Sequence, residues 1–459
     1  MENNFSPAQL ARRDTERLNG YRQLLDFYHG QQWDSRERRG EKHLTFNYAR
    51  VFIEKIASYL MSGVTFTVDP VEDTDEAQVK AQSAEAALHR VYEENNLEQL
   101  DLETEIDCAI LGDAAYKVTW NTGTKSIRVT APDVQGIYAW WAADDMSQIW
   151  RIASKYSMSG EMAETMYMVK PQGRTAMVVE VWTDREFELW VDGIRVDRRP
   201  NPYGFIPFVI YPNLREPKKF WGLSDLVQVK GTQQELNRAL SQLSRILELS
   251  GNPIAVLENI EESDDIAVSP GAVWNVPESA KAYLLDLLQG GGVRLHIDYI
   301  NLLYRILHDL SESPRAAFGG TERDLSGIAL EIELQPLLQK VRRKRLVRTA
   351  VYNKRNRMIL KLLEKFRDVD FGDNHLRVVW GPVVPTDMTR LVSNEQILVQ
   401  NGIHSRRSAM DEIGVKNPET EFKQWLEERE TILRMNKEPG TKPARGGGRE
   451  RELPPEALS

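Results

Sequence analysis

The sequence has a single cysteine, Cys108, among its 459 residues. One thiol excludes an internal disulfide framework and any cysteine-cluster metal site. No apolar run approaches the roughly 18 residues that a membrane span needs. The N-terminal stretch MENNFSPAQLARRDTERLNG also lacks the apolar core of a signal peptide. We therefore expect no membrane contact, and a soluble protein or part of a soluble assembly that forms in a reducing cytoplasm.

Motifs that mark catalysis are missing as well. The glycines of GGTERDLSG (319–327) lack the Gly-Lys-Ser/Thr end of a phosphate-binding loop. The seven histidines include no His-Glu-x-x-His pair, and His296 and His308 lie too far apart on one expected helix to share a metal ion. The acidic runs 73–75 and 262–265 could hold a divalent cation, but such runs are more often solvated turns. We interpret the chain as a non-enzyme with no cofactor and no metal.

The charge balance is acidic, with 59 Lys and Arg against 68 Asp and Glu and a net charge of -9. This balance argues against a protein that coats nucleic acid, because such affinity comes mostly from neutralised phosphates. One segment departs from it: residues 340–357, KVRRKRLVRTAVYNKRNR, carry nine Lys or Arg and no acid. The apolar share of 41% is sufficient for a globular core.

Hydrophobic periodicity predicts an α+β fold, with a mixed first half and a helical second half. In the first half we expect helices at 7–29, 47–62 and 76–112, and strands at VTFTVDP, AAYKVTW, SIRVTA, TAMVVEVW, EFELWVD and FVIYP. In the second half we expect helices at 224–250, 294–312 and 326–366, the strand LRVVWGP, and two short helices around NGIHSRRSAMDEIGV. Pro336 should kink or break the longest helix, since proline removes a backbone donor.

The order of these segments resembles that of the portal proteins, or head–tail connectors, of tailed double-stranded DNA bacteriophages. The matching stretches are YRQLLDFYHGQQW, NYARVFIEKIASYLMSG, GFIPFVIYPN, WGLSDLVQVKGTQQELNRALSQL, SGIALEIELQPLLQKV and GIHSRRSAMDEIGVKNPETEFKQWLEER. The resemblance implies a ring, usually of twelve subunits, at one capsid vertex of the virion, assembled in the host cytoplasm. Double-stranded DNA passes through it non-specifically at packaging and ejection. The implied partners are the terminase motor, the scaffolding or major capsid protein and a neck adaptor protein.

The resemblance also divides the chain into regions. It implies a wing (1–223), two stem helices (224–250 and 294–313), a small β-containing clip (251–293), a tunnel loop (314–325), a long kinked wing helix with a strand (326–395), a helical crown (396–436) and a disordered tail (437–459). The tunnel loop would face DNA through Arg315, Phe318, Gly319, Gly320 and Arg323. Glycine permits backbone mobility there, and Phe318 could pack against a neighbouring loop. An ordinary polar connection between helices is the alternative.

Two charged clusters need separate interpretation. The acids Glu258, Glu261, Glu262, Asp264 and Asp265 could steer a basic partner to the clip, although a solvated turn explains them almost as well. The basic wing helix offers Lys340, Arg342, Arg343, Lys344, Arg345 and Arg348. We expect it mainly to face the acidic segment 85–107, which holds eight acids and one arginine, within or between subunits. Contact with packaged DNA is the alternative.

A different class of function also fits part of the sequence. Residues 394–415 have the outline of a helix-turn-helix DNA reader, with Arg406 and Arg407 at the start of the second helix. Together with the basic block 340–357, they would suit a transcription-type regulator. Many acids follow closely, however, which weakens this interpretation. A structural capsid-associated protein without a channel is a third option.

Overall fold

A computed structural model describes residues 7–34, 42–170, 173–251, 254–258, 279, 281–285, 292–320, 327–383, 388–415 and 418–437. The chain divides after Val383 into two compact units. The first unit contains both helices and strands, and the described part of the second unit is helical. The predicted α+β class is confirmed.

The N-terminal region is more finely divided than its periodicity predicts. Its helices are α1 (Pro7–Arg13), α2 (Thr15–Tyr28), α3 (Tyr48–Leu60), α4 (Asp75–Glu94) and α5 (Leu97–Leu111). The long helical region expected over 76–112 is divided into two helices, because Asn96 adopts a left-handed backbone with φ of +48° between α4 and α5. Asparagine tolerates this conformation better than most residues, so the two helices can change direction there.

Antiparallel strands build three sheets in this region. They are β1 (Val64–Pro70), β2 (Asp113–Asn121), β3 (Ser126–Thr130), β4 (Ile137–Trp141), β5 (Ile149–Ser159), β6 (Thr175–Trp182), β7 (Glu186–Val191), β8 (Ile194–Pro200), β9 (Phe208–Pro212) and β12 (Asn374–Trp380). The sheet orders are β3-β2-β9, β4-β5-β6-β7-β8 and β1-β12. Strands β4, β5 and β8 and the short helix α6 (Gly160–Tyr167) were not predicted from the sequence. Strand β8, IRVDRRP, is an edge strand whose charged side chains hide its strand character.

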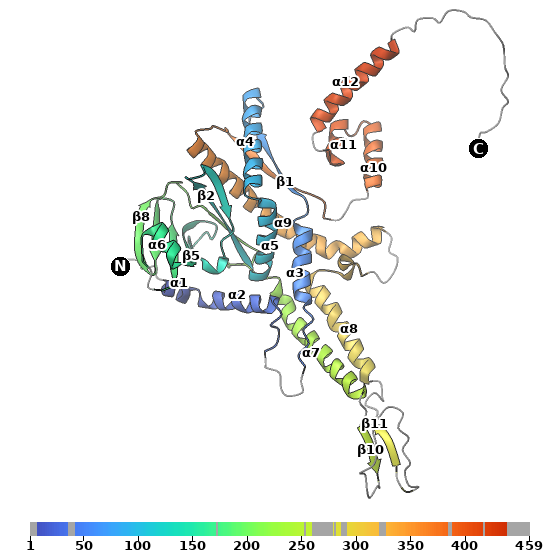
Figure 1. Ribbon diagram of the computed structural model, residues 1–459. Helices are drawn as coiled ribbons and strands as arrows, with labels where there is room; N and C mark the ends of the chain where they lie inside the picture. Colours follow the sequence, from blue (N-terminus) through green and yellow to red (C-terminus); the bar gives the residue numbers. More distant parts are fainter. Residues whose placement is uncertain are drawn as a thin grey trace, which may run out of the picture. The chain divides into compact units, whose positions relative to one another are not determined.

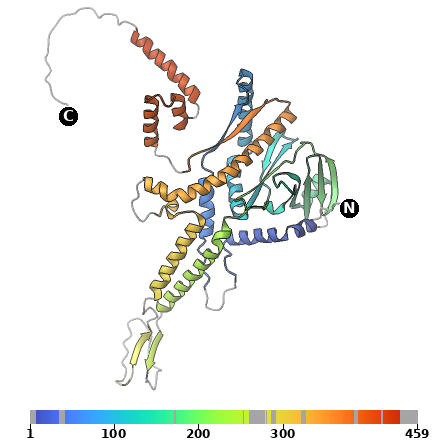
Figure 2. The same cartoon turned by 180° about the vertical axis from the view of Figure 1, so that it is seen from behind.

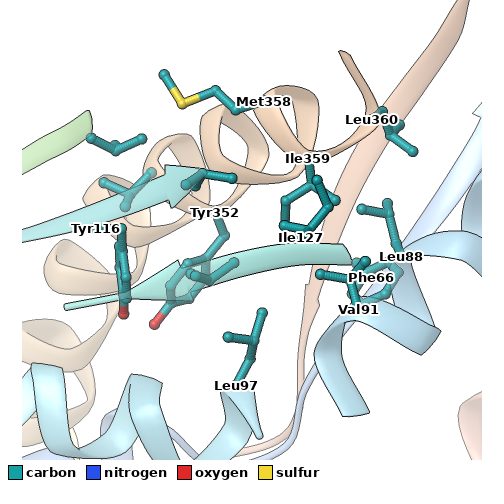
Figure 3. Close-up of a cluster of buried hydrophobic side chains, with 14 of the residues drawn as sticks. Phe66, Leu88, Val91, Leu97, Tyr116, Ile127, Tyr352, Met358, Ile359 and Leu360 are labelled. Atoms are coloured by element: carbon teal, nitrogen blue, oxygen red, sulfur yellow. The ribbon is translucent and has the colours of Figure 1, made fainter. Parts of the chain in front are cut away.

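The main core lies where α4, α5, β2, β3 and the long helix α9 (Gly327–Arg367) meet. Figure 3 shows side chains from these elements converging on one another. The labelled residues are Phe66, Leu88, Val91, Leu97, Tyr116, Ile127, Tyr352, Met358, Ile359 and Leu360. Because α9 contributes the C-terminal part of this cluster, burial of apolar surface fixes one half of that helix against α4, α5, β2 and β3.

Two helices leave this region together, α7 (Leu226–Gly251) and α8 (Gly292–Ser311). They pack against each other, and the hairpin of β10 (Ile254–Glu258) and β11 (Lys281–Leu285) lies beyond their far ends (Figure 1). The next helix, α9, continues through Pro336, so the possible break there is wrong. Figure 2 shows the α9 ribbon changing direction part-way along its length.

The second unit contains α10 (Met388–Gln400), α11 (Arg406–Glu412) and α12 (Pro418–Lys437). Ser405 caps α11 by accepting a hydrogen bond from the backbone N–H of Ser408. Helix α11 contacts both of its neighbours. The predicted tail, 438–459, lies outside the described residues.

Candidate functional site

The basic block of α9 places several of its cations along one buried side of the helix. Lys340, Lys344, Arg348 and Arg355 recur at spacings of four, four and seven residues, which place them along one side of a helix. Their side chains are almost inaccessible, with 0–3% of each residue exposed. Burial of four cations is costly unless each is paired, so the elements packed on α9 must supply their partners.

Asp225, one residue before α7, is the partner of both lysines. Its carboxylate lies 3.0 Å from Nζ of Lys340 and 2.5 Å from Nζ of Lys344. The backbone N–H of Asp225 donates to the carbonyl of Ala109 in α5 at 3.0 Å, which holds the loop before α7 against α5. Burial alone would raise the pKa of Asp225, but the two lysines outweigh it and hold that pKa far below its ordinary value.

The two arginines pair with α5. Arg348 reaches Glu105 with both Nε and Nη2, at 2.9 and 2.6 Å, and also donates to the carbonyl of Asn213 at 2.7 Å. Arg355 forms a two-pronged pair with Asp101, whose Oδ2 accepts from Nη2 at 2.8 Å. Burial opposes the charged form of each arginine, yet the adjoining carboxylates raise the pKa of both. Such planar, bidentate geometry suits arginine rather than lysine.

The remaining basic residues of the predicted cluster are placed differently. Arg342 is exposed, and Arg343 forms a surface pair with Glu312 at 2.7 Å. Arg345 donates to backbone carbonyls, among them that of Gly381 at 2.7 Å. The acidic segment 85–107 therefore supplies partners for Arg348 and Arg355 within the chain, while Asp225 is a partner that the sequence analysis missed. The only signal for it was an acid in the first turn of a predicted helix, 224–250.

The described part of the predicted tunnel loop is an ordered turn between α8 and α9. A short 3₁₀ helix, η2 (Arg315–Phe318), ends at Gly319, whose φ of +80° favours glycine. Phe318 packs edge-on against Phe52 of α3 and His308 of α8. Arg315 is exposed, and its guanidinium lies 5.4 Å from the ring of Tyr304. Gly320 closes the turn by donating its N–H to the carbonyl of Arg315, and Arg323 lies outside the described residues.

Only the first of the five clip acids is described. Glu258 is exposed at the end of β10 and accepts a hydrogen bond from the hydroxyl of Tyr283 in β11 at 3.1 Å. Glu261, Glu262, Asp264 and Asp265 lie outside the described residues. The described part of segment 251–293 contains this hairpin, in which β10 and β11 pair antiparallel.

The second unit does have two short helices in succession, as the sequence predicts for 394–415. Arg406 and Arg407, the expected base-reading residues, each lie over an aromatic ring of α12. The guanidinium of Arg406 is 4.2 Å from the Trp425 ring, and that of Arg407 is 4.8 Å from the Phe422 ring. These cation–π contacts engage both arginines inside the unit.

A buried carboxyl group joins α2 to the loop before α7. Asp113, at the start of β2, accepts hydrogen bonds from the hydroxyl of Tyr21 at 2.5 Å and the N–H of Gly222 at 2.7 Å. The backbone approaches closely here, because a Cβ on Gly222 would lie 2.4 Å from the carbonyl oxygen of Gly112. Burial raises the pKa of Asp113 from 3.8 to about 6, although both hydrogen bonds oppose the rise.

This raised pKa predicts a pH-dependent stability that Asp113→Asn removes. Between about pH 4 and pH 6 the folded protein keeps a proton that the unfolded chain has already released, so stability falls as pH rises through that window. One such group contributes a slope of up to about 1.4 kcal/mol per pH unit. Urea unfolding of both proteins at each pH checks this. The difference in unfolding free energy, wild type minus variant, should decline from pH 4 to 6 and then level off. A constant difference would contradict the prediction.

Membrane-spanning helices and metal-binding clusters are both absent from the residues that the structure describes. None of the helices there is both long enough and apolar enough to cross a membrane. Within the same residues, no three His, Cys, Asp or Glu side chains are grouped so as to hold a metal ion.

Comparison with known families places the chain. A family described as phage portal protein, SPP1 Gp6-like, matches residues 8–434, which include both structural units. The chain belongs to this family. A comparison with curated proteins gave no match. Because the family match continues through 394–415, it assigns the α10–α11 pair to a portal protein and gives the regulator interpretation no support.

Membership in the family indicates which regions the buried ion pairs connect. This chain is a bacteriophage portal protein, a head–tail connector involved in DNA packaging. The family implies a ring at a capsid vertex, with capsid, terminase and DNA as partners. In this portal protein Asp225 lies where the predicted wing meets the predicted stem, and α9 carries cations that bind both regions. The buried face of the basic block is thus occupied by acids of the same chain.

Proposed function

We propose that this portal protein closes into a passive ring, usually of twelve subunits, through which double-stranded DNA is packaged and later ejected. The apolar side chains left exposed on the paired helices α7 and α8 support this proposal. They include Leu247, Leu295, Tyr299, Leu302 and Leu310, with 39–71% of each residue exposed. An apolar helix face of this kind on a single chain indicates a protein interface. The two helices would form the stem of the ring.

The connection between α8 and α9 is our proposed DNA-proximal loop. Arg315 is exposed at its start, while Phe318 anchors the turn to α3 and α8. One exposed cation per subunit would touch phosphates transiently, and the net charge of -9 per chain would keep the ring from holding the duplex. Residues 321–326, including Arg323, would complete the loop.

The β10–β11 hairpin, with the acids that follow it, is proposed as the clip that docks the terminase motor and afterwards the neck adaptor. Glu258, exposed on this hairpin, supports an acidic docking surface. ATP hydrolysis would belong to the terminase, since the sequence lacks a phosphate-binding loop. The crown, 396–436, would face the capsid interior, and assembly with scaffolding or major capsid protein would take place in the host cytoplasm.

Negative-stain electron microscopy of the purified chain, with sedimentation velocity, tests the proposal. The expected result is a particle of several hundred kilodaltons with a central hole. Duplexes of unrelated sequence, added at several salt concentrations, should bind equally weakly. A monomer or dimer that selects one duplex sequence would overturn the proposal. A large particle without a hole would favour a capsid-associated protein that has no channel.

A further inference from the structure

Two cations near the buried ion pairs have no carboxylate partner among the described residues. Arg215, after β9, and Lys354, on α9, both line a cavity of about 310 Å³. Its floor is apolar and includes Tyr211 and Val351. Lys354 remains exposed at the cavity, yet desolvation by the surrounding protein lowers the pKa of its ammonium group, with no acid to offset it. We call this surface the basic cavity.

A second surface carries acids that have no ion-pair partner among the described residues. Asp107 of α5 and Asp133, before β4, line a cavity of about 320 Å³ that also includes Leu25 and Leu111. Glu103 lies one helical turn before Asp107. Burial raises the pKa of Asp107, and the negative charges of Asp133 and Glu103 raise it further. In the part of the chain that the structure describes, none of these three acids has an ion-pair partner. We call this surface the acidic cavity.

Some of the charges close to these two surfaces are paired within the chain. On the same two helices, Arg348 and Arg355 of α9 meet Glu105 and Asp101 of α5 at bidentate distance. A chain that neutralises these cations internally leaves Lys354, one residue before Arg355, without an acid. Like charges held together beside a surface cavity favour an opposite charge from outside the chain.

We propose that the basic cavity of one copy of this chain binds the acidic cavity of the next copy. This inference rests on the proposed ring and names the contact that would close it. Arg215 and Lys354 would meet Glu103, Asp107 and Asp133, and the apolar side chains lining both cavities would be covered. Two different surfaces that pair in this way make a heterologous contact, which is the kind that generates rings. Charge complementarity would also select the correct orientation during assembly.

Charge reversal on each surface, alone and together, tests this contact. The first variant is Arg215→Glu with Lys354→Glu, and the second is Glu103→Lys with Asp107→Lys. Each places like charges across the contact, so each alone should show at least a tenfold loss of the ring fraction in sedimentation velocity and electron microscopy. All four changes in one chain restore opposite charges and should return rings. An equimolar mixture of the two variants should also form rings, with an even number of subunits in alternation.

The matched control is Lys361→Glu, an exposed lysine seven residues after Lys354 on α9 and outside the cavity. It should assemble like the wild type. If the wild type forms rings and the single-surface variants do so equally well, the contact is wrong. The contact is also wrong if the single-surface variants lose rings and the variant with all four changes does not regain them. It is likewise wrong if the single-surface variants keep their rings and only their retention of DNA falls. If the wild type itself forms no ring, the proposed function fails instead.

Discussion

Asp225→Asn is expected to lower the free energy of unfolding by about 3–5 kcal/mol, the usual cost of removing one partner from a buried ion pair. Asparagine keeps the shape of the side chain and removes its charge. Lys340 and Lys344 would then remain buried, 3% and 1% exposed, and both would lose their ion pair with a carboxylate. Because Asp225 also joins the start of α7 to α5, the variant should loosen the attachment of α7 to α5. Urea unfolding at one fixed protein concentration measures the loss.

Arg343→Ala is the control for this experiment. It removes a pair of the same charge type from the same helix, but Arg343 is 51% and Glu312 34% exposed at the side chain. Water already solvates both groups, so the expected loss is below about 1 kcal/mol. Equal losses for the two variants would show that burial of the Asp225 cluster does not govern its contribution. A normal stability for Asp225→Asn would show that the lysines find other partners or release their protons at low cost.

Arg348→Met should have an effect of similar size, and a second substitution should reverse part of it. Methionine fills most of the arginine volume but leaves Glu105 charged and buried, so we expect a loss of about 3–5 kcal/mol. Adding Glu105→Leu removes the unpaired charge. The carbonyl of Asn213 still lacks the donor it had in Arg348, which costs about 1–3 kcal/mol. The double variant should therefore lie between the wild type and Arg348→Met.

A thermodynamic cycle over the four proteins measures this coupling. The single variant Glu105→Leu completes it, and it should be strongly destabilised because Arg348 keeps its charge without a carboxylate. Far-UV circular dichroism in urea, at matched protein concentration, gives the four free energies. Additive losses would mean that the pair contributes no specific interaction. Near-wild-type stability of the double variant would mean that the bonds from Arg348 to the backbone contribute little.

Long, strongly periodic helices were predictable because each carries its own pattern. The predicted 224–250 and 294–312 became α7 and α8 with shifts of a few residues. Elements whose pattern is weak were not found. Strand β8 is largely charged, and the division between α4 and α5 depends on the backbone of one asparagine. The region from β4 to β8 forms a sheet through pairing between strands, and a pairing partner leaves little trace in either strand alone.

The sequence also does not predict which side chains of the candidate site contact one another. The sequence marks 340–357 as basic and 85–107 as acidic, but charge alone does not tell which members meet. Arg348 and Arg355 meet acids of that segment, Lys340 and Lys344 meet Asp225, and Arg345 binds backbone carbonyls. Burial decides these roles, and burial depends on which side of α9 packs against the other elements of the first unit.

The sequence by itself determined the α+β class, the order of segments typical of a phage portal protein, the acidic balance and the position of the basic helix. These properties follow from composition and local periodicity, which a single chain segment carries alone. Only the tertiary structure decided that Lys344 meets Asp225, 119 residues away, and that Arg348 meets Glu105, 243 residues away. An ion pair between distant segments requires the fold to exclude water from both charges at one place. The sequence of a single segment does not specify where the fold will bury the two charges together.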